Sequence, residues 1–176
     1  MNIGLIFGTD TGNTEEVGDK IAGVFATHGL AMEIINVTEA SREVIESFDF
    51  IIMGIPTWDF GGIQEDWESF ENEILNLNLS NKIVALYGLG DQFGYGDYFV
   101  DAMGWLYERI LKTNATVIGE WSTTGYEFDA SLAANKDKTF FCGLAIDDDQ
   151  QFEMTDDRIN SWVDLLLIQL EQLQVA

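Results

Sequence analysis

Short apolar runs alternate with longer segments of helical spacing along the whole chain. The apolar runs predict strands at residues 3–7, 32–37, 50–54, 83–87, 116–121 and 139–146. The first, third and fourth runs are almost entirely apolar, which is typical of strands that are covered on both faces in a parallel sheet. The pattern therefore favours a sheet with a layer of helices on each side.

The segments between the strands carry apolar residues at the spacing of amphipathic helices. Stripes of this kind extend over residues 17–28, 67–74, 99–110 and 159–170. Thr155 is expected as the N-cap of the last helix, with Asp156 and Asp157 in its positively polarised first turn. Residues 41–47 add one short helix to the prediction.

The alternation of strands and helices predicts the fold class α/β, with an open parallel sheet and right-handed crossovers. The fifth strand is interrupted, because a polar stretch at residues 122–138 separates two apolar halves. We interpret this stretch as an inserted loop. A chain of 176 residues predicts a single domain over residues 1–176.

The chain has 31 acidic and 8 basic residues and a formal net charge of −23. Its aromatic content of 12% favours a packed core over an acidic disordered chain. Repulsion by phosphate groups argues against nucleic acid and anionic membranes as partners, so the expected partner is a basic protein surface. We expect a cytoplasmic protein, because the sequence shows neither a signal segment nor an apolar run of about 18 residues.

The single Cys142 and the single His28 exclude further classes of site. One cysteine cannot form an intramolecular disulfide, and together the two residues cannot build a Cys/His zinc site or a four-cysteine iron–sulfur site. The acidic run Asp147-Asp148-Asp149 lacks the glycine and the distal glutamate of a calcium-binding loop. No metal is therefore expected.

The loop after the first strand has the composition of a phosphate cradle. Gly8 and Gly12 allow tight turns, the following helix start offers unpaired amides, and hydroxyl and amide side chains add donors. The loop has neither the Gly-Lys-Ser/Thr of a Walker A loop nor a Gly-x-Gly-x-x-Gly fingerprint, and the first lysine is Lys20. The pattern indicates one terminal phosphate held by neutral donors. The alternative is that these side chains only cap a helix.

Two further loops at the same edge of the predicted sheet are rich in aromatic residues. Residues 55–62 follow the third strand and contain Trp58 and Phe60, and residues 88–99 follow the fourth strand and contain Phe93, Tyr95 and Tyr98. In a doubly wound sheet the ligand binds beyond the carboxyl ends of the strands. The loops therefore suggest a planar ring stacked between aromatic faces, although exposed aromatic residues also mark protein interfaces.

These motifs carry a resemblance to a known family. The segments Thr9-Asp10-Thr11-Gly12-Asn13-Thr14, Pro56-Thr57-Trp58 and Gly90-Asp91-Gln92-x-Gly-Tyr95 resemble a flavodoxin in order and spacing. The interrupted fifth strand resembles the insertion of long-chain flavodoxins, and the loops are most similar to those of the second flavodoxin of proteobacteria. The resemblance implies a flavodoxin-like doubly wound three-layer sandwich with a five-stranded parallel sheet in the order 2-1-3-4-5.

The resemblance also implies non-covalently bound FMN. Residues 9–14 would hold the phosphate, Thr57 and Asp147 would lie along the ribityl chain, and Trp58 and Tyr95 would cover opposite faces of the isoalloxazine. Asp91 and the backbone of residues 89–99 would face the pyrimidine edge, and the Asp59–Phe60 peptide would lie beside N5. The predicted cofactor-binding residues are Thr9, Asp10, Thr11, Gly12, Asn13, Thr14, Pro56, Thr57, Trp58, Asp59, Phe60, Gly61, Leu89, Gly90, Asp91, Tyr95, Tyr98, Phe99 and Asp147.

The implied function is electron transfer rather than enzymatic catalysis. A flavodoxin would carry one electron at a time at low potential in a semiquinone/hydroquinone cycle, because surrounding carboxylates disfavour the anionic hydroquinone. Its partners would be basic-surfaced redox proteins, namely a flavodoxin/ferredoxin NADP reductase and acceptor enzymes. Residues 43–81 contain nine carboxylates without Lys or Arg, and residues 139–157 contain six, so we expect an acidic rim around the flavin of a monomeric carrier.

Two other functions compete with electron transfer, and the first, a receiver domain of a signalling system, shares the predicted topology. A receiver domain needs an acidic pair after the first strand, an aspartate after the third and a lysine after the fifth. This chain has Phe7-Gly8, residues 54–56 and no lysine at those places, which excludes that function. An FMN-dependent NAD(P)H-quinone reductase remains the alternative. The insertion is expected to serve docking, so its deletion would spare FMN binding and slow electron transfer.

Overall fold

A parallel sheet forms the centre of the computed structural model, which describes residues 1–175. Five strands lie side by side in the order β2 (Glu33–Asn36), β1 (Ile3–Phe7), β3 (Phe50–Trp58), β5 (Ile83–Leu89) and β6 (Thr116–Ile118). β9 (Leu144–Ile146) also pairs in parallel with β5, and the short β4 (Gly62–Ile63) pairs antiparallel with β3. The predicted α/β class and strand order are thereby confirmed.

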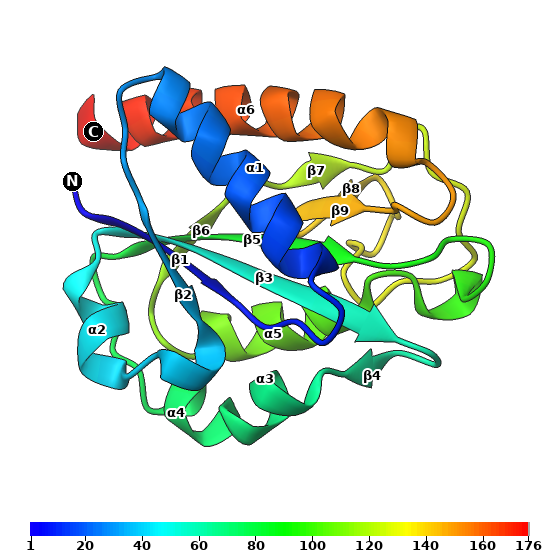
Figure 1. The fold of residues 1–176 in the computed structure, drawn as a ribbon, viewed down its shortest axis with the longest axis horizontal. Helices are drawn as coiled ribbons and strands as arrows, with labels where there is room; N and C mark the ends of the chain where they lie inside the picture. The colour runs from blue at the N-terminus through cyan, green and yellow to red at the C-terminus, as the bar shows by residue number, and fades with distance from the viewer. Residues whose placement is uncertain (176) are drawn as a thin grey trace.

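Helices cover both faces of the sheet (Figure 1). One face carries α1 (Asn13–Thr27) and α6 (Thr155–Val175), and the other carries α2 (Arg42–Ser47), α3 (Glu65–Ser69), α4 (Glu71–Leu75) and α5 (Asp101–Leu111). Short 3-10 turns lie at Val37–Glu39, Gly96–Tyr98 and Phe152–Met154. Each face has its own apolar cluster, as expected for a three-layer sandwich whose central strands are apolar on both sides.

The interruption of the fifth strand has a clear geometry. β6 pairs with residues 83–85 of β5 and β9 pairs with residues 87–89, so two separate pieces line the same neighbour. Between them, β7 (Trp121–Ser122) and β8 (Phe140–Phe141) form an antiparallel pair outside the main sheet. Gly119 has a φ of 87°, where the chain leaves β6, and a Cβ at Gly143 would overlap the carbonyl of Leu86. The insertion thus leaves and rejoins the sheet at glycines.

Several helix boundaries differ from the prediction. The stripe at residues 67–74 forms two helices, because Phe70 ends α3 and begins α4 with a ψ of −2°. α5 begins at Asp101 rather than Phe99, because Val100 has a left-handed φ of 48°. Thr155 is the first residue of α6 in helical conformation and not its N-cap, and its hydroxyl donates to Asp148 Oδ1 at 2.5 Å. Among the described residues no helix is both long and apolar enough to cross a bilayer.

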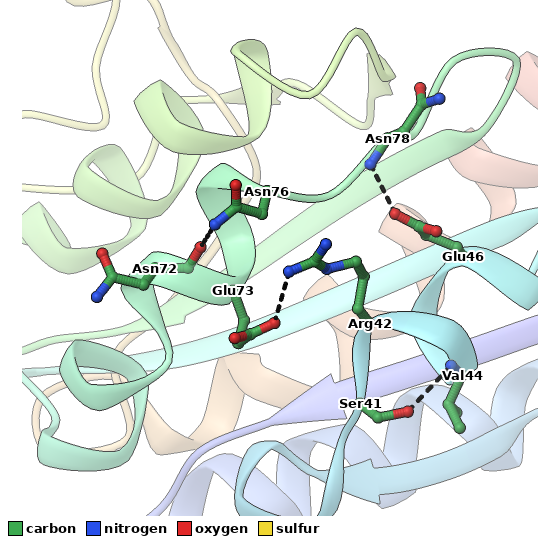
Figure 2. Close-up of polar contacts among 8 residues, drawn as sticks. All are labelled: Ser41, Arg42, Val44, Glu46, Asn72, Glu73, Asn76 and Asn78. Carbon is green, nitrogen blue, oxygen red and sulfur yellow. Dashed lines mark hydrogen bonds and ion pairs between the residues drawn. The ribbon is translucent and has the colours of Figure 1, made fainter.

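The predicted short helix at residues 41–47 is confirmed as α2, with Ser41 as its N-cap (Figure 2). The close-up shows Arg42 pointing toward Glu73 of α4, with Nη2 and Oε2 3.2 Å apart. Glu46 accepts a 2.8 Å hydrogen bond from the amide of Asn78. These contacts join α2 to the segment around α4, near the amino ends of β3 and β5. Glu46 and Glu73 belong to the acidic stretch 43–81, from which we expected a rim around the flavin. These two carboxylates lie near the opposite edge of the sheet and bind neighbouring residues there.

Candidate functional site

A cavity of about 300 Å³ opens at the carboxyl ends of β1, β3 and β5. It lies where the strand order reverses between β1 and β3, which is the usual place of a ligand in a doubly wound sheet. Of the described residues that line it, five are aspartates and none is basic. The lining residues are Thr9, Asp10, Thr11, Asn13, Thr14, Pro56, Thr57, Trp58, Asp59, Leu89, Gly90, Asp91, Tyr95, Tyr98, Asp148 and Asp149.

The loop before α1 forms one end of this cavity. Gly12 has a left-handed φ of 91°, and its amide donates to Thr9 Oγ1 at 2.9 Å. The first bond within α1 runs from the Glu16 amide to the Gly12 carbonyl, so the amides of residues 13–15 lie before it at the positive end of the helix. Hydroxyl and amide side chains of the same loop line the cavity. This donor set suits a phosphate group without a basic side chain.

Aromatic side chains form the other end of the cavity. Trp58, Tyr95 and Tyr98 line it, with exposed fractions of 37%, 36% and 37%. Phe60 is 76% exposed and does not line it, and its ring meets those of Tyr95 and Tyr98 edge-on at centroid distances of 5.7 and 5.8 Å. A slot between partly exposed rings suits a flat conjugated ligand.

The turn between β3 and β4 holds Asp59 in a left-handed conformation. Trp58 pairs with Gly62, so Asp59, Phe60 and Gly61 form the turn, with φ values of 45° at Asp59 and 80° at Gly61. The Tyr95 hydroxyl donates to Asp59 Oδ1 at 3.1 Å, and this hydrogen bond together with the Asp59 charge raises the pKa of Tyr95. The contact connects the two aromatic loops.

Asp91 organises the loop after β5. Its Oδ1 accepts hydrogen bonds from the amides of Phe93 and Gly94 and from Gln150 Nε2, at 3.0, 2.7 and 3.0 Å. Partial burial raises the pKa of Asp91, but these hydrogen bonds outweigh that effect and leave its pKa below the ordinary value. The cavity therefore has an ionised carboxylate beside the aromatic slot at neutral pH.

Asp147, which the resemblance places along the ribityl chain, lies behind the described lining of the cavity. It is fully buried and is not among the residues that line the cavity. Its Oδ2 accepts from the Gln92 amide and from Gln92 Nε2 at 2.9 and 2.8 Å, and its Oδ1 accepts from the Gln150 amide at 3.0 Å. Asp148 and Asp149 line the cavity instead. Partial burial, followed by the charges of nearby aspartates, raises the pKa of Asp149.

The structure brings most of the predicted site residues together. Of the 19, Gly12, Phe60, Gly61, Phe99 and Asp147 are absent from the described lining. Gly12 and Gly61 shape turns, and Phe99 is fully buried with its ring directed at Tyr126, Phe128 and Phe141. The contacts of the lining residues with FMN remain predictions.

Two residues that support the cavity, Gln64 and Trp67, are not predicted from the sequence. Gln64 is buried, and its Nε2 donates to Asp10 Oδ1 at 3.1 Å while its Oε1 accepts from the Trp67 amide. The Trp67 indole donates to the Gly54 carbonyl at 2.9 Å. A Cβ at Gly8 would overlap Gln64. This glycine therefore makes room for the side chain that connects the loop before α1 to α3. The apolar position of Trp67 in the helical stripe was the only signal in the sequence.

The insertion supports the loop after β5. The amides of Asp129 and Ala130 donate to the Gly96 carbonyl at 2.9 and 3.0 Å, and the Phe99 amide donates to the Ala130 carbonyl at 3.2 Å. The Glu127 amide donates to Gln92 Oε1 at 2.6 Å. Because Tyr95 and Tyr98 belong to the supported loop, these contacts give a reason to expect that deleting the insertion weakens ligand binding instead of sparing it.

Comparison with known proteins settles the family. The family model described as Flavodoxin matches residues 5–162. The chain belongs to the flavodoxin family. It is 41% identical over 172 residues to Flavodoxin 2 of Escherichia coli (strain K12), covering 98% of each chain. It is 46% identical over 162 residues to a flavodoxin of Trichodesmium erythraeum (strain IMS101), covering 92% of this chain and 93% of the relative.

A solved structure agrees with the family and the fold. The Fusobacterium nucleatum flavodoxin bound to flavin mononucleotide superposes with a TM-score of 0.88 at 28% identity, over 96% of this chain and 98% of that one. The expected flavodoxin fold and the expected likeness to the second proteobacterial flavodoxin are confirmed. As a member of this family, the chain is an electron carrier rather than an enzyme.

Proposed function

We propose that residues 1–176 form one FMN-binding domain that transfers electrons between redox proteins. The observation that carries this proposal is that one cavity has a phosphate cradle of neutral donors at one end, without a basic residue in its described lining, and an aromatic slot at the other end. The two ends match the phosphate and the isoalloxazine ring of FMN. When bound, FMN supplies a ring that accepts and releases electrons one or two at a time.

The residues of the cavity bind and orient the cofactor. The amides of residues 13–15 in the first turn of α1 and the side chains of Thr9, Thr11 and Asn13 would donate to the phosphate, which fixes one end of the molecule. Trp58 and Tyr95 cover the ring and exclude water from its faces. Thr57 Oγ1 accepts from the Ala102 amide at 3.1 Å, so its own hydrogen is directed to another acceptor, which we assign to the ribityl chain.

The aspartates around the cavity lower the potential at which the second electron is added. A carboxylate about 10 Å away, at an effective dielectric constant of about 40, opposes an added negative charge by about 0.8 kcal/mol, or about 35 mV. Five aspartates line the cavity, and the phosphate has no basic neighbour among the described lining residues. The protein therefore transfers one electron at a time at low potential.

A redox titration of the FMN-loaded protein tests this function. We expect two separate one-electron steps, the second at the lower potential, because a proton taken up from water would neutralise the first added electron, whereas the second would leave a net negative charge near the aspartates. A single two-electron step would contradict the proposal. Incubation with NADPH alone should leave the absorption spectrum unchanged. Rapid bleaching without a reductase would instead favour the alternative, an NAD(P)H-quinone reductase.

We assign the partners to basic-surfaced redox proteins, namely a flavodoxin/ferredoxin NADP reductase and acceptor enzymes. Glu65 and Glu68 are exposed on α3, directly after the turn that borders the cavity. They would attract a basic surface to the edge at which electrons leave. The proposal includes a monomeric carrier in the cytoplasm, which size-exclusion chromatography and cell fractionation can test.

The salt dependence of reduction checks this assignment. The rate constant for reduction by the reductase should fall as ionic strength rises, because screening weakens attraction between exposed charges. Neutralisation by Glu65→Gln and Glu68→Gln together should flatten that dependence. Glu33→Gln, at an exposed position on the far edge strand β2, is the control and should change it less. If the rate constant fell equally steeply with ionic strength in all variants, α3 would have no docking role.

A further inference from the structure

Tyr87 is a fully buried tyrosine of β5 that contacts the start of α1. Its hydroxyl donates to the Thr14 carbonyl at 2.8 Å, a bond between residues 73 positions apart. Thr14 belongs to the first turn of α1 and lines the cavity at the phosphate end. The bond therefore connects strand β5 of the central sheet to the first turn of α1, which forms part of the phosphate cradle.

Two glycines make room for the Tyr87 side chain. Gly54 is its register partner on β3, and a Cβ there would overlap the Tyr87 ring. Gly18 lies one turn into α1, and a Cβ there would stand 2.8 Å from the hydroxyl oxygen. The phenol thus crosses β3 and reaches the helix only because both positions lack a side chain.

The carbonyl that accepts this bond belongs to the Thr14–Glu15 peptide group. The amide of the same group, that of Glu15, precedes the first bond within α1, which runs from Glu16 to Gly12. Because a peptide group is planar, holding its carbonyl also holds the direction of its amide. A donor on the carbonyl side also polarises the group, which strengthens its amide as a donor.

Tyr87 stays protonated and can donate at all ordinary pH values. Burial raises its pKa well above the usual value, and the charges of Asp19 and Glu15 act in the same direction. Its single donor is therefore available for the Thr14 carbonyl.

We propose that Tyr87 is a positioning residue for the phosphate cradle: its hydroxyl fixes the Thr14–Glu15 peptide group so that the helix start presents its amides to the phosphate of FMN. The inference rests on the proposed FMN site and adds a specificity to it. Tyr87 strengthens binding of the phosphorylated flavin and not of the ring itself, because the ring lies against Trp58 and Tyr95 at the other end of the cavity.

The apo-protein with Tyr87→Phe tests this role, with FMN and riboflavin as probes. Riboflavin is the same flavin without the phosphate. Loss of one neutral hydrogen bond should weaken FMN binding about fivefold and change riboflavin binding less than about twofold. The dissociation constants follow from quenching of flavin fluorescence. Tyr107→Phe removes a hydroxyl from α5, away from the lining residues, and is the matched control that should leave both constants unchanged.

A second variant uses the space around the hydroxyl. Gly18→Ala should weaken FMN binding more than Tyr87→Phe does, because its new methyl displaces the phenol. In the Tyr87→Phe background the same change should cost much less, since the hydroxyl is gone, the remaining close neighbour is the flexible end of Leu5 at 3.0 Å, and alanine favours a helix over glycine. Thermal unfolding of each apo variant monitors its stability. If Tyr87 had a purely structural role, the dissociation constants of FMN and riboflavin would rise by the same factor.

The outcomes separate this inference from the proposed function. Equal loss of FMN and riboflavin affinity in Tyr87→Phe, no loss at all, or an equal cost of Gly18→Ala in both backgrounds would overturn the role of Tyr87 while leaving the FMN site intact. Failure of the unaltered protein to bind FMN would overturn the proposed function and this inference with it.

Discussion

Phe99→Ala is expected to lower the free energy of unfolding of the apo-protein by about 3–5 kcal/mol. Phe99 is fully buried, and its ring lies 5.7 Å from the rings of both Phe128 and Phe141 and 5.8 Å from that of Tyr126. Removing it leaves a cavity between the insertion and the loop after β5. FMN affinity should fall as well, because the neighbouring Tyr98 lines the ligand cavity.

Urea unfolding followed by circular dichroism measures the loss of stability, and titration with FMN measures the affinity. Phe93→Ala is the matched control, because Phe93 belongs to the same loop but is 59% exposed. It should change the free energy of unfolding by less than about 0.5 kcal/mol. A Phe99→Ala protein as stable as the Phe93→Ala protein would show that the insertion does not support the loop.

Trp58→Ala is expected to weaken FMN binding by about 1–3 kcal/mol, the range measured for stacking of a base on an aromatic side chain. This corresponds to roughly 5- to 150-fold in the dissociation constant. Trp58 is partly exposed, so little packing is lost without the ligand and apo-protein stability should change little. The two variants thus separate binding from folding.

Phe60→Ala provides the comparison for Trp58. Phe60 follows in the same turn and is more exposed, but it does not line the cavity. Its removal should weaken FMN binding less than about threefold, which is below 1 kcal/mol. If Phe60→Ala weakened binding more than Trp58→Ala, Phe60 would be the residue that covers the flavin.

The position of the site was predictable because parallel strands bring their carboxyl ends to one edge. The loops that contain Thr9, Trp58 and Tyr95 therefore had to meet, whatever the details of packing. The near-continuous apolar runs of the central strands likewise required helices on both faces. These features depend on local patterns and on general rules of topology.

The structure differs from the sequence-based prediction where a residue distant in the sequence determines the position of a side chain. Asp147 turns inward because Gln92 donates to it twice from another loop, and this leaves the cavity to Asp148 and Asp149. Phe99 is buried because the insertion supplies Tyr126 and Phe128. The spacing of apolar and polar residues in the sequence does not predict these contacts. The contact of Tyr87 with Thr14 similarly depends on the register of β5 against Gly54 of β3.

The ion pairs near the amino ends of the strands have a consequence for encounters with other proteins. Arg42 pairs with Glu73, Arg109 with Glu71 and Lys82 with Asp49, so negative charge is partly neutralised at that end. No basic residue stands beside the five aspartates in the described lining of the cavity, and Lys20 of α1 pairs with Asp156 at the start of α6 instead. We therefore expect the molecule to have an electric dipole moment along the strands. In the field of a positively charged partner it experiences a torque, which turns the cavity edge toward that partner before the surfaces touch.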